Sequence, residues 1–135
     1  MSVVKELIMQ ENSLISFGNY ELNEKAKKSD FIYNKDSYKI KTFKDITRLE
    51  KNDKFLFESV PGTAVHSFKE DENGMEFTIE GEHSVEVTLG LLPEEEYKVF
   101  LQGKEEPVLK TNLGGKLTIS LDLKNEGPIK VKVVK

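Results

Sequence analysis

Three consecutive glutamates, Glu94 to Glu96, form an acidic cluster that raises the question of a carboxylate site. Paired carboxylates can hydrolyse glycosidic bonds, and several together can bind a cation. The cluster follows Pro93 and precedes Tyr97, between two segments in which apolar and polar residues alternate. A proline interrupts strand pairing because it has no N–H donor. The sequence therefore predicts a turn whose glutamates face solvent.

The two histidines, His66 and His83, are the other candidates for metal binding or acid–base chemistry. His66 is out of phase with Val65, so we expect its side chain to point to solvent. The segment from Asp71 to Gly74 lacks the oxygen spacing of a calcium loop and is typical of a hairpin turn. Since cysteine is also absent, we predict no catalytic residue, no metal site and no cofactor.

Residues 25–54 hold 10 basic and 5 acidic residues, although the 135-residue chain has a net charge of −4. A basic face could bind an anionic polymer, and a solvated surface is the alternative. Arg48 is the single arginine. Proteins that grip phosphates with defined geometry mostly use the bidentate guanidinium group. Nucleic acid is therefore not expected as a partner.

Aromatic residues gather in the same stretch. Their rings could stack on sugars, or they could form the core of the first half of the chain. Phe55 and Phe57 alternate with polar or aliphatic neighbours, which favours core positions for both. The candidate binding residues are Tyr33, Tyr38, Lys39, Lys41 and Arg48.

A two-residue period dominates the sequence, and turn signals such as Pro61-Gly62 and Gly114-Gly115 separate its segments. Many short strands at this spacing are typical of a sandwich or barrel. The pattern predicts strands at 3–9, 13–21, 30–34, 37–42, 54–59, 64–69, 74–80, 83–89, 96–102, 107–111, 116–123 and 128–134.

Two stretches leave their structure open. Residues 22–29 are polar and rich in lysine, which fits a loop or a short exposed helix. Residues 42–50 could begin a helix with Thr42 as N-cap, or could be extended, and the extended form is favoured.

The turn at Leu91, Pro93 and Tyr97 resembles the corner between strands E and F of fibronectin type III and immunoglobulin-like domains. That resemblance, over roughly residues 64–134, implies that Tyr97 buries its ring and returns its hydroxyl to the upstream backbone. The segment Thr111–Leu117 is similar to a hairpin of sandwich modules attached to bacterial carbohydrate-active enzymes. Those modules bind glycans, or space and stabilise a neighbouring domain.

Four segments extend a second resemblance over nearly the whole chain: ENSLISFGNYEL, SYKIKTFKDITRLEKN, FESVPGTAV and KTNLGGKL. They resemble small Firmicutes proteins often labelled "endosialidase", a label that implies cleavage within polysialic acid. Sialidases hold their substrate carboxylate with several arginines on a large propeller. This chain has one arginine, no tryptophan, and too few residues for four blades of about 40–45 residues each.

We therefore expect an all-β protein, a β-sandwich that forms one compact unit over residues 1–135. In this interpretation, residues 1–62 supply additional N-terminal strands and residues 63–135 form an immunoglobulin-like part. The amino-terminal residues lack the apolar run of a signal peptide, and no segment has the ~20 apolar residues of a membrane span. We expect a cytoplasmic location and no membrane partner.

For function, the sequence favours a non-enzymatic binding or assembly domain, and the two resemblances imply an association with glycans. The expected partner is a glycan or a protein, including a second copy of the chain through an open sheet edge. An endosialidase-like glycosidase is the alternative, so whether the chain is an enzyme stays open. Binding of an anionic polymer through residues 25–54 is a further alternative.

Overall fold

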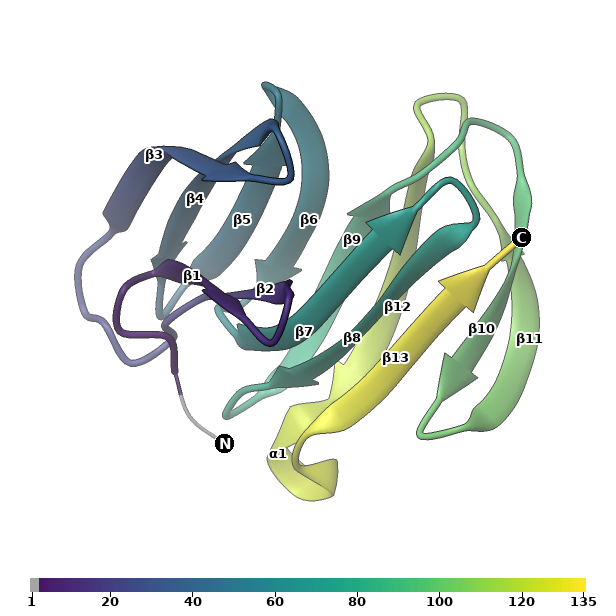
Figure 1. The fold of residues 1–135 in the computed structure, drawn as a ribbon. Helices are drawn as coiled ribbons and strands as arrows, with labels where there is room; N and C mark the ends of the chain where they lie inside the picture. The colour runs from purple at the N-terminus through teal and green to yellow at the C-terminus, as the bar shows by residue number, and fades with distance from the viewer. Residues whose placement is uncertain (1–2) are drawn as a thin grey trace.

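The computed structural model describes residues 3–135, which form an all-β sandwich of two antiparallel sheets (Figure 1). Within these residues there are thirteen strands and one short helix. The strands are β1 (Ile8–Glu11), β2 (Leu14–Phe17), β3 (Ala26–Tyr33), β4 (Asp36–Phe43), β5 (Ile46–Lys51), β6 (Lys54–Val60), β7 (Ala64–Asp71), β8 (Gly74–Glu80), β9 (Ser84–Gly90), β10 (Glu96–Leu101), β11 (Lys104–Lys110), β12 (Lys116–Asp122) and β13 (Ile129–Val134). The helix α1 (Leu123–Glu126) lies between β12 and β13.

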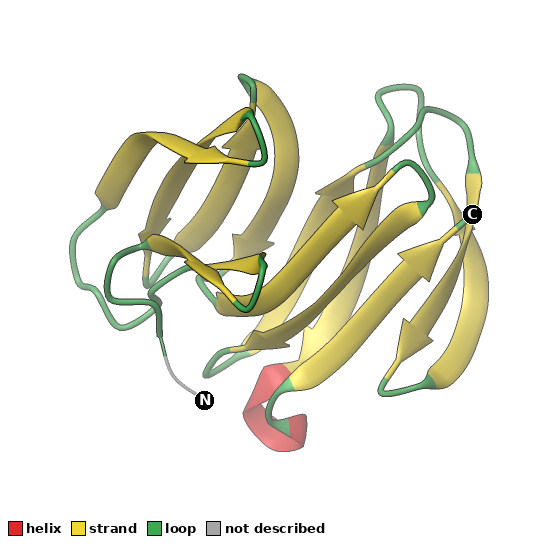
Figure 2. Ribbon diagram, in the orientation of Figure 1, coloured by secondary structure: helices red, strands yellow, loops and turns green. Residues whose placement is uncertain are grey.

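The seven-stranded sheet has the order β1-β2-β7-β8-β13-β10-β11, and the six-stranded sheet has the order β12-β9-β6-β5-β4-β3. Figure 2 shows strands throughout both sheets, with α1 where the chain passes from one to the other. Strands from before and after residue 62 pair directly in both sheets: β2 with β7, and β6 with β9. The N-terminal strands therefore extend both sheets.

The core lies between the sheets because alternate side chains of each strand point inward. At its centre, the rings of Phe17, Phe57, Phe68 and Phe77 make edge-on and tilted contacts, with centroids 5.2 to 6.4 Å apart. These rings come from strands of both sheets, so they join the two layers.

Several hairpins turn through two residues with positive φ, as right-twisted strands require. Asn34-Lys35 and Asn52-Asp53 are examples, with φ between 51° and 71°. Asparagine tolerates this conformation better than most residues do, which explains its place at the first position of both turns.

The turn before β10 has the predicted structure. Tyr97 is 1% exposed, and its hydroxyl accepts a hydrogen bond from the backbone N–H of Leu92 at 3.2 Å. Glu94 and Glu96 are exposed and Glu95 is half-buried, so the acidic cluster forms the end of the turn and the first residue of β10. Whether residues 63–135 are related to immunoglobulin-like modules stays a prediction.

Five parts of the secondary structure differ from the sequence-based expectation. The predicted strand 13–21 is too long, because β2 ends at Phe17 and Gly18 follows with φ 101°. The predicted strand 3–9 is wrong, because the chain bends at Leu7 (φ 74°) and β1 begins at Ile8. Residues 26–29, expected as loop or helix, begin the edge strand β3. Residues 42–50 form the end of β4, a turn and β5, so the helix alternative is wrong. The short helix α1 was not predicted.

Candidate functional site

The five candidate binding residues divide between two faces of the six-stranded sheet. Lys39, Lys41 and Arg48 lie on its outer face, where Lys41 is directly opposite Arg48. Tyr38 points the other way and is 5% exposed within the core. The ring centroids of Tyr33 and Tyr38 lie 6.2 Å apart, and the Tyr33 hydroxyl donates a hydrogen bond to the backbone oxygen of Ser13. The five residues therefore do not form one site.

The three basic candidates line a small cleft of about 100 Å³ together with Lys27 and Glu50. Arg48 forms ion pairs with Glu58 at 2.8 Å and Glu50 at 3.2 Å. Partial burial works to lower the pKa of Arg48, but the hydrogen bonds with these two glutamates prevail and raise it. The guanidinium is thus occupied within the protein, and lysines supply the free charge of this cleft.

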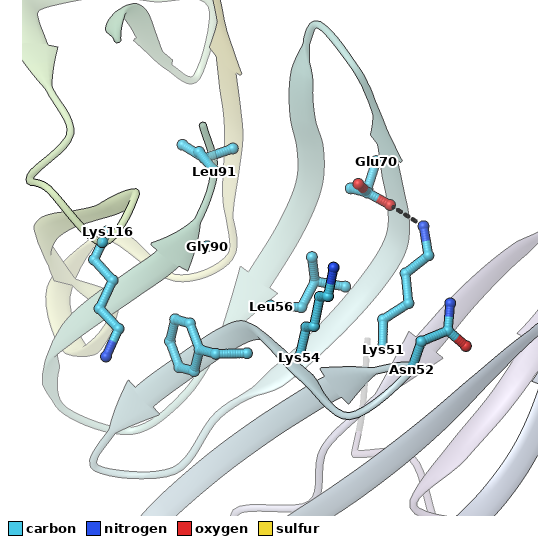
Figure 3. A pocket seen from close by; sticks show the side chains of 10 residues that line it. Lys51, Asn52, Lys54, Leu56, Glu70, Gly90, Leu91 and Lys116 are labelled. Carbon is cyan, nitrogen blue, oxygen red and sulfur yellow. Dashed lines mark hydrogen bonds and ion pairs between the residues drawn. The ribbon is translucent and has the colours of Figure 1, made fainter. Parts of the chain in front are cut away.

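A larger groove of about 510 Å³ opens beside the β5–β6 hairpin. Its other walls are formed by β7, by the end of β9 and by the start of β12. Figure 3 shows Lys51, Lys54 and Lys116 around it, with a dashed line between Lys51 and Glu70. The groove is lined by Lys51, Asn52, Lys54, Phe55, Leu56, Glu70, Gly90, Leu91, Gly114 and Lys116.

Phe55 is the half-buried aromatic ring of this groove. The Nζ atom of Lys116 lies 4.9 Å from the ring centroid, and Cζ of Arg48 lies 5.0 Å from it. Both distances allow attraction between a cation and the electron-rich face of the ring. The ring therefore lies within a positively charged part of the surface.

Gly90 makes this arrangement possible. A Cβ atom at position 90 would lie 2.4 Å from the backbone oxygen of Phe55 and 3.1 Å from its ring. Gly90 also pairs with Lys116 in the neighbouring strand. Because β9 has no side chain here, Lys116 can extend across it to Phe55.

Lys51 forms one wall of the groove. Its Nζ atom lies 2.8 Å from Glu70 and 3.6 Å from Asp36. Partial burial works to lower the pKa of Lys51, but the hydrogen bond and charge of Glu70, with a smaller effect of Asp36, raise it. Lys51 therefore keeps its charge and links the two sheets.

The histidines lie elsewhere. His66 is not fully solvent-facing as expected: its side chain is 16% exposed, and Nε2 lies 3.7 Å from Oε1 of the buried Glu80. The cause is that Glu80 lies on the neighbouring strand of the same sheet, where β7 pairs with β8. His83 is exposed in the turn before β9. Residues 3–135 contain no group of three or more side chains able to hold a metal ion.

Sequence reasoning missed the groove because it placed Phe55 in the core with Phe57. Leu49 pairs with Phe57 and Glu50 pairs with Phe55, so Leu56 is an extra residue in β6. This bulge reverses the alternation, turning Phe55 outward while Leu56 is buried. Gly90, the last residue of β9, was the available signal for a close backbone approach.

No helix among residues 3–135 has the length and apolar composition needed to cross a membrane. Comparisons with protein-family models, with curated proteins and with solved structures find no match to this chain.

Proposed function

We propose that the chain is a non-enzymatic binding domain for an acidic glycan, and that the glycan binds in the groove beside Phe55. The observation that carries the proposal is the combination of three lysines and one aromatic ring around an opening of about 510 Å³. This volume is typical of small-ligand sites, which combine an apolar surface with a few charged groups.

The charge of the groove favours an anion. Lys51 is paired with Glu70, whereas Lys54 and Lys116 are in no ion pair with any residue from 3 to 135. Their two ammonium groups can each donate hydrogen bonds to a carboxylate. Charge-assisted hydrogen bonds of this kind are roughly twice as strong as neutral ones.

The ring supplies the second part of the recognition. The carbon-bearing face of a pyranose sugar is apolar and can pack against Phe55, while the lysines bind a carboxylate on the same sugar. The resemblance of KTNLGGKL and the other segments to proteins labelled "endosialidase" supports a glycan as the ligand class. Lys116 and Gly114, which line the groove, belong to that segment.

Calorimetric titration with polysialic acid oligomers tests the proposal, with a neutral oligosaccharide of equal length as the control ligand. We expect binding of the acidic oligomer alone. Lys54→Ala should weaken it about fivefold, the effect of losing about 1 kcal/mol. Lys132→Ala removes an exposed lysine from the other sheet and is the matched control.

Two results would overturn the proposal. One is equal binding by the wild-type chain and Lys54→Ala. The other is shortening of the polymer during incubation, measured by gel electrophoresis, which would establish the glycosidase alternative instead.

A second candidate function is binding of a longer anionic polymer across the outer face of the six-stranded sheet. In its favour, Lys27 is opposite Lys41, and Lys41 is opposite Arg48, so three cations lie in one row across β3, β4 and β5. Lys41→Ala would weaken this binding and leave the groove unaffected. Such binding should also fall steeply with added salt, because it rests on charge alone.

A further inference from the structure

The four edge strands of the sandwich differ in how they resist pairing with another chain. Exposed edges are blunted in proteins by short strands, bulges, prolines and charges. β1 has four residues. β3 carries a bulge between Lys28 and Phe31, with Asp30 at φ 59°. β11 contains Pro107 and an irregular register with β10.

The fourth edge strand, β12, has no proline and no bulge, and its charged residues are confined to its two ends, Lys116 and Asp122. Its seven residues, KLTISLD, pair with β9 in unbroken register from Lys116 to Asp122. Within residues 3–135, no strand pairs with its other side. An edge this regular is suited to strand addition.

The hydrogen-bonding groups available at this edge can be identified. The N–H of Lys116 donates to the Oδ1 atom of Asn112, and its C=O accepts from the N–H of Asn112, so both point away from β9. Backbone groups alternate in direction along an antiparallel strand. The N–H and C=O groups of Thr118 and Ser120 therefore also point to the open edge.

We propose that β12 pairs antiparallel with β12 of a second copy of this chain, about a two-fold axis at Ile119. The segment is complementary to itself in this register. Lys116 is opposite Asp122, Leu117 is opposite Leu121, Thr118 is opposite Ser120, and Ile119 is opposite itself.

The register pairs the free backbone groups at the centre of the segment, while Lys116 keeps its own backbone hydrogen bonds with Asn112. Thr118 and Ser120 are the residues with free outward groups, and they exchange hydrogen bonds with each other across the axis. Opposite charges lie at each end of the paired segment, which is stabilising between neighbouring strands, and the Asp122 carboxylate there also accepts two hydrogen bonds from Asn125 of its own chain. Shifting the register by two residues would leave Lys116 opposite Ser120 or beyond the paired segment.

Pairing of this kind uses the same surface on both copies, so it closes after two chains. It joins the two six-stranded sheets into one continuous sheet. Leu117, Ile119 and Leu121 would extend the apolar layer across the axis, because they face the core in each copy.

Sedimentation equilibrium over a range of protein concentrations tests the proposal. We expect a reversible monomer–dimer equilibrium with no larger species. Ser120→Pro removes an outward N–H but no hydrogen bond to β9, and an edge strand accepts proline at such a position. This variant should be monomeric, whereas Ser120→Ala, which keeps the N–H, should dimerise as the wild-type chain does.

A monomeric wild-type chain at every concentration would overturn the proposal, as would a dimer that persists in Ser120→Pro. Circular dichroism establishes whether Ser120→Pro is folded. The result does not depend on the proposed glycan, since no ligand is present.

Exchanging charges provides a second test that does not rely on proline. Lys116→Glu places two acids opposite each other at each end of the dimer, and Asp122→Lys places two lysines there. Each variant alone should dimerise more weakly than the wild-type chain. An equimolar mixture should restore the dimer, because every end then pairs one acid with one lysine. Failure of the mixture to associate would exclude this register.

Discussion

The two ends of the six-stranded sheet are built from different kinds of inward-facing residue. At the β12–β9 end, these residues are aliphatic, as Ile119, Leu89 and Val87 illustrate. At the β4–β5 end, the inward positions include Thr42 and Thr47, which are both 0% exposed.

The buried hydroxyls are joined in one chain of hydrogen bonds. The N–H of Asn19 donates to Oγ1 of Thr42, whose oxygen lies 2.8 Å from Oγ1 of Thr47, and the Thr47 hydroxyl donates to the backbone oxygen of Thr63. The N–H of Thr63 returns a bond to Thr47 at 3.1 Å. Two irregular segments are thereby fixed to the sheet.

The regular end at β12 and the irregular end at β3 are therefore stabilised in different ways. An aliphatic end needs only complementary shape, so β12 and β9 pair in unbroken register and the edge stays open to pairing. The polar end must satisfy every buried hydrogen-bonding group, and it does so by holding loop backbone against the sheet. Its bulged, charged edge at β3 is correspondingly unsuited to strand addition.

The largest loss of stability is expected from a substitution at Phe57, where the two ends of the six-stranded sheet meet. Phe57 pairs with Leu49 on one side and Leu89 on the other, and it contacts three further phenylalanine rings. Phe57→Ala should lower the free energy of unfolding by about 3–5 kcal/mol, because it removes a buried ring and leaves a cavity. Urea denaturation followed by fluorescence or circular dichroism measures this loss. A loss below 1 kcal/mol would mean that the two ends are not joined through this residue.

A matched pair of threonine substitutions separates the two ends with an intermediate effect. Thr47→Val keeps the shape but leaves the N–H of Thr63 and the hydroxyl of Thr42 without their partner, at a cost of about 1–3 kcal/mol. Thr118→Val removes an exposed hydroxyl that lies 3.1 Å from that of Thr88 and should change stability by less than about 0.5 kcal/mol. Equal effects in the two urea titrations would show that the hydroxyl chain does not stabilise the polar end.

The smallest expected effect on stability comes from the pH dependence of one carboxylate at each end of the sheet, Asp36 and Asp122. Asn52 donates a side-chain hydrogen bond that lowers the pKa of Asp36, and Asn125 lowers the pKa of Asp122 through its side chain and backbone. A pKa lowered by folding stabilises the protein above the unfolded value, near 3.9, and this contribution is lost as the pH falls through the folded value. Both ends should therefore lose stability slightly below about pH 4.

Titration of the carboxyl carbons by NMR measures each site separately. Asn52→Ala should raise the pKa of Asp36 and leave that of Asp122 unchanged, and Asn125→Ala should do the reverse. If one substitution shifted the pKa values of both aspartates, the two ends would be electrostatically coupled and would not be independent of each other.

Much of the fold follows from local pattern. The alternating segments around Val87, Ile119 and Val131 are strands because each presents one apolar face to the core. Tyr97 behaves as predicted because a corner of this kind is fixed within seven residues of sequence. The errors fall where tertiary contacts decide: β3 is polar throughout much of its length and is a strand because β4 pairs with it.

The candidate site was less predictable. Tyr38 and Lys39 are neighbours in sequence and point to opposite faces, so a cluster in the sequence does not become a cluster in space. The groove depends on one bulged residue, Leu56, and on the approach of segments 90–91 and 114–116. No periodicity in a single sequence encodes either feature, since both depend on which strands become neighbours.

The position of Lys116 connects the two proposals thermodynamically. The ammonium group of Lys116 lies over Phe55 in the groove. Lys116 is also the first residue of β12, where it lies opposite Asp122 of the partner copy in the proposed dimer. One ammonium cannot serve a bound carboxylate and a partner aspartate equally at the same time. Glycan affinity should therefore vary with protein concentration, and self-association with glycan concentration, by the same reciprocal factor.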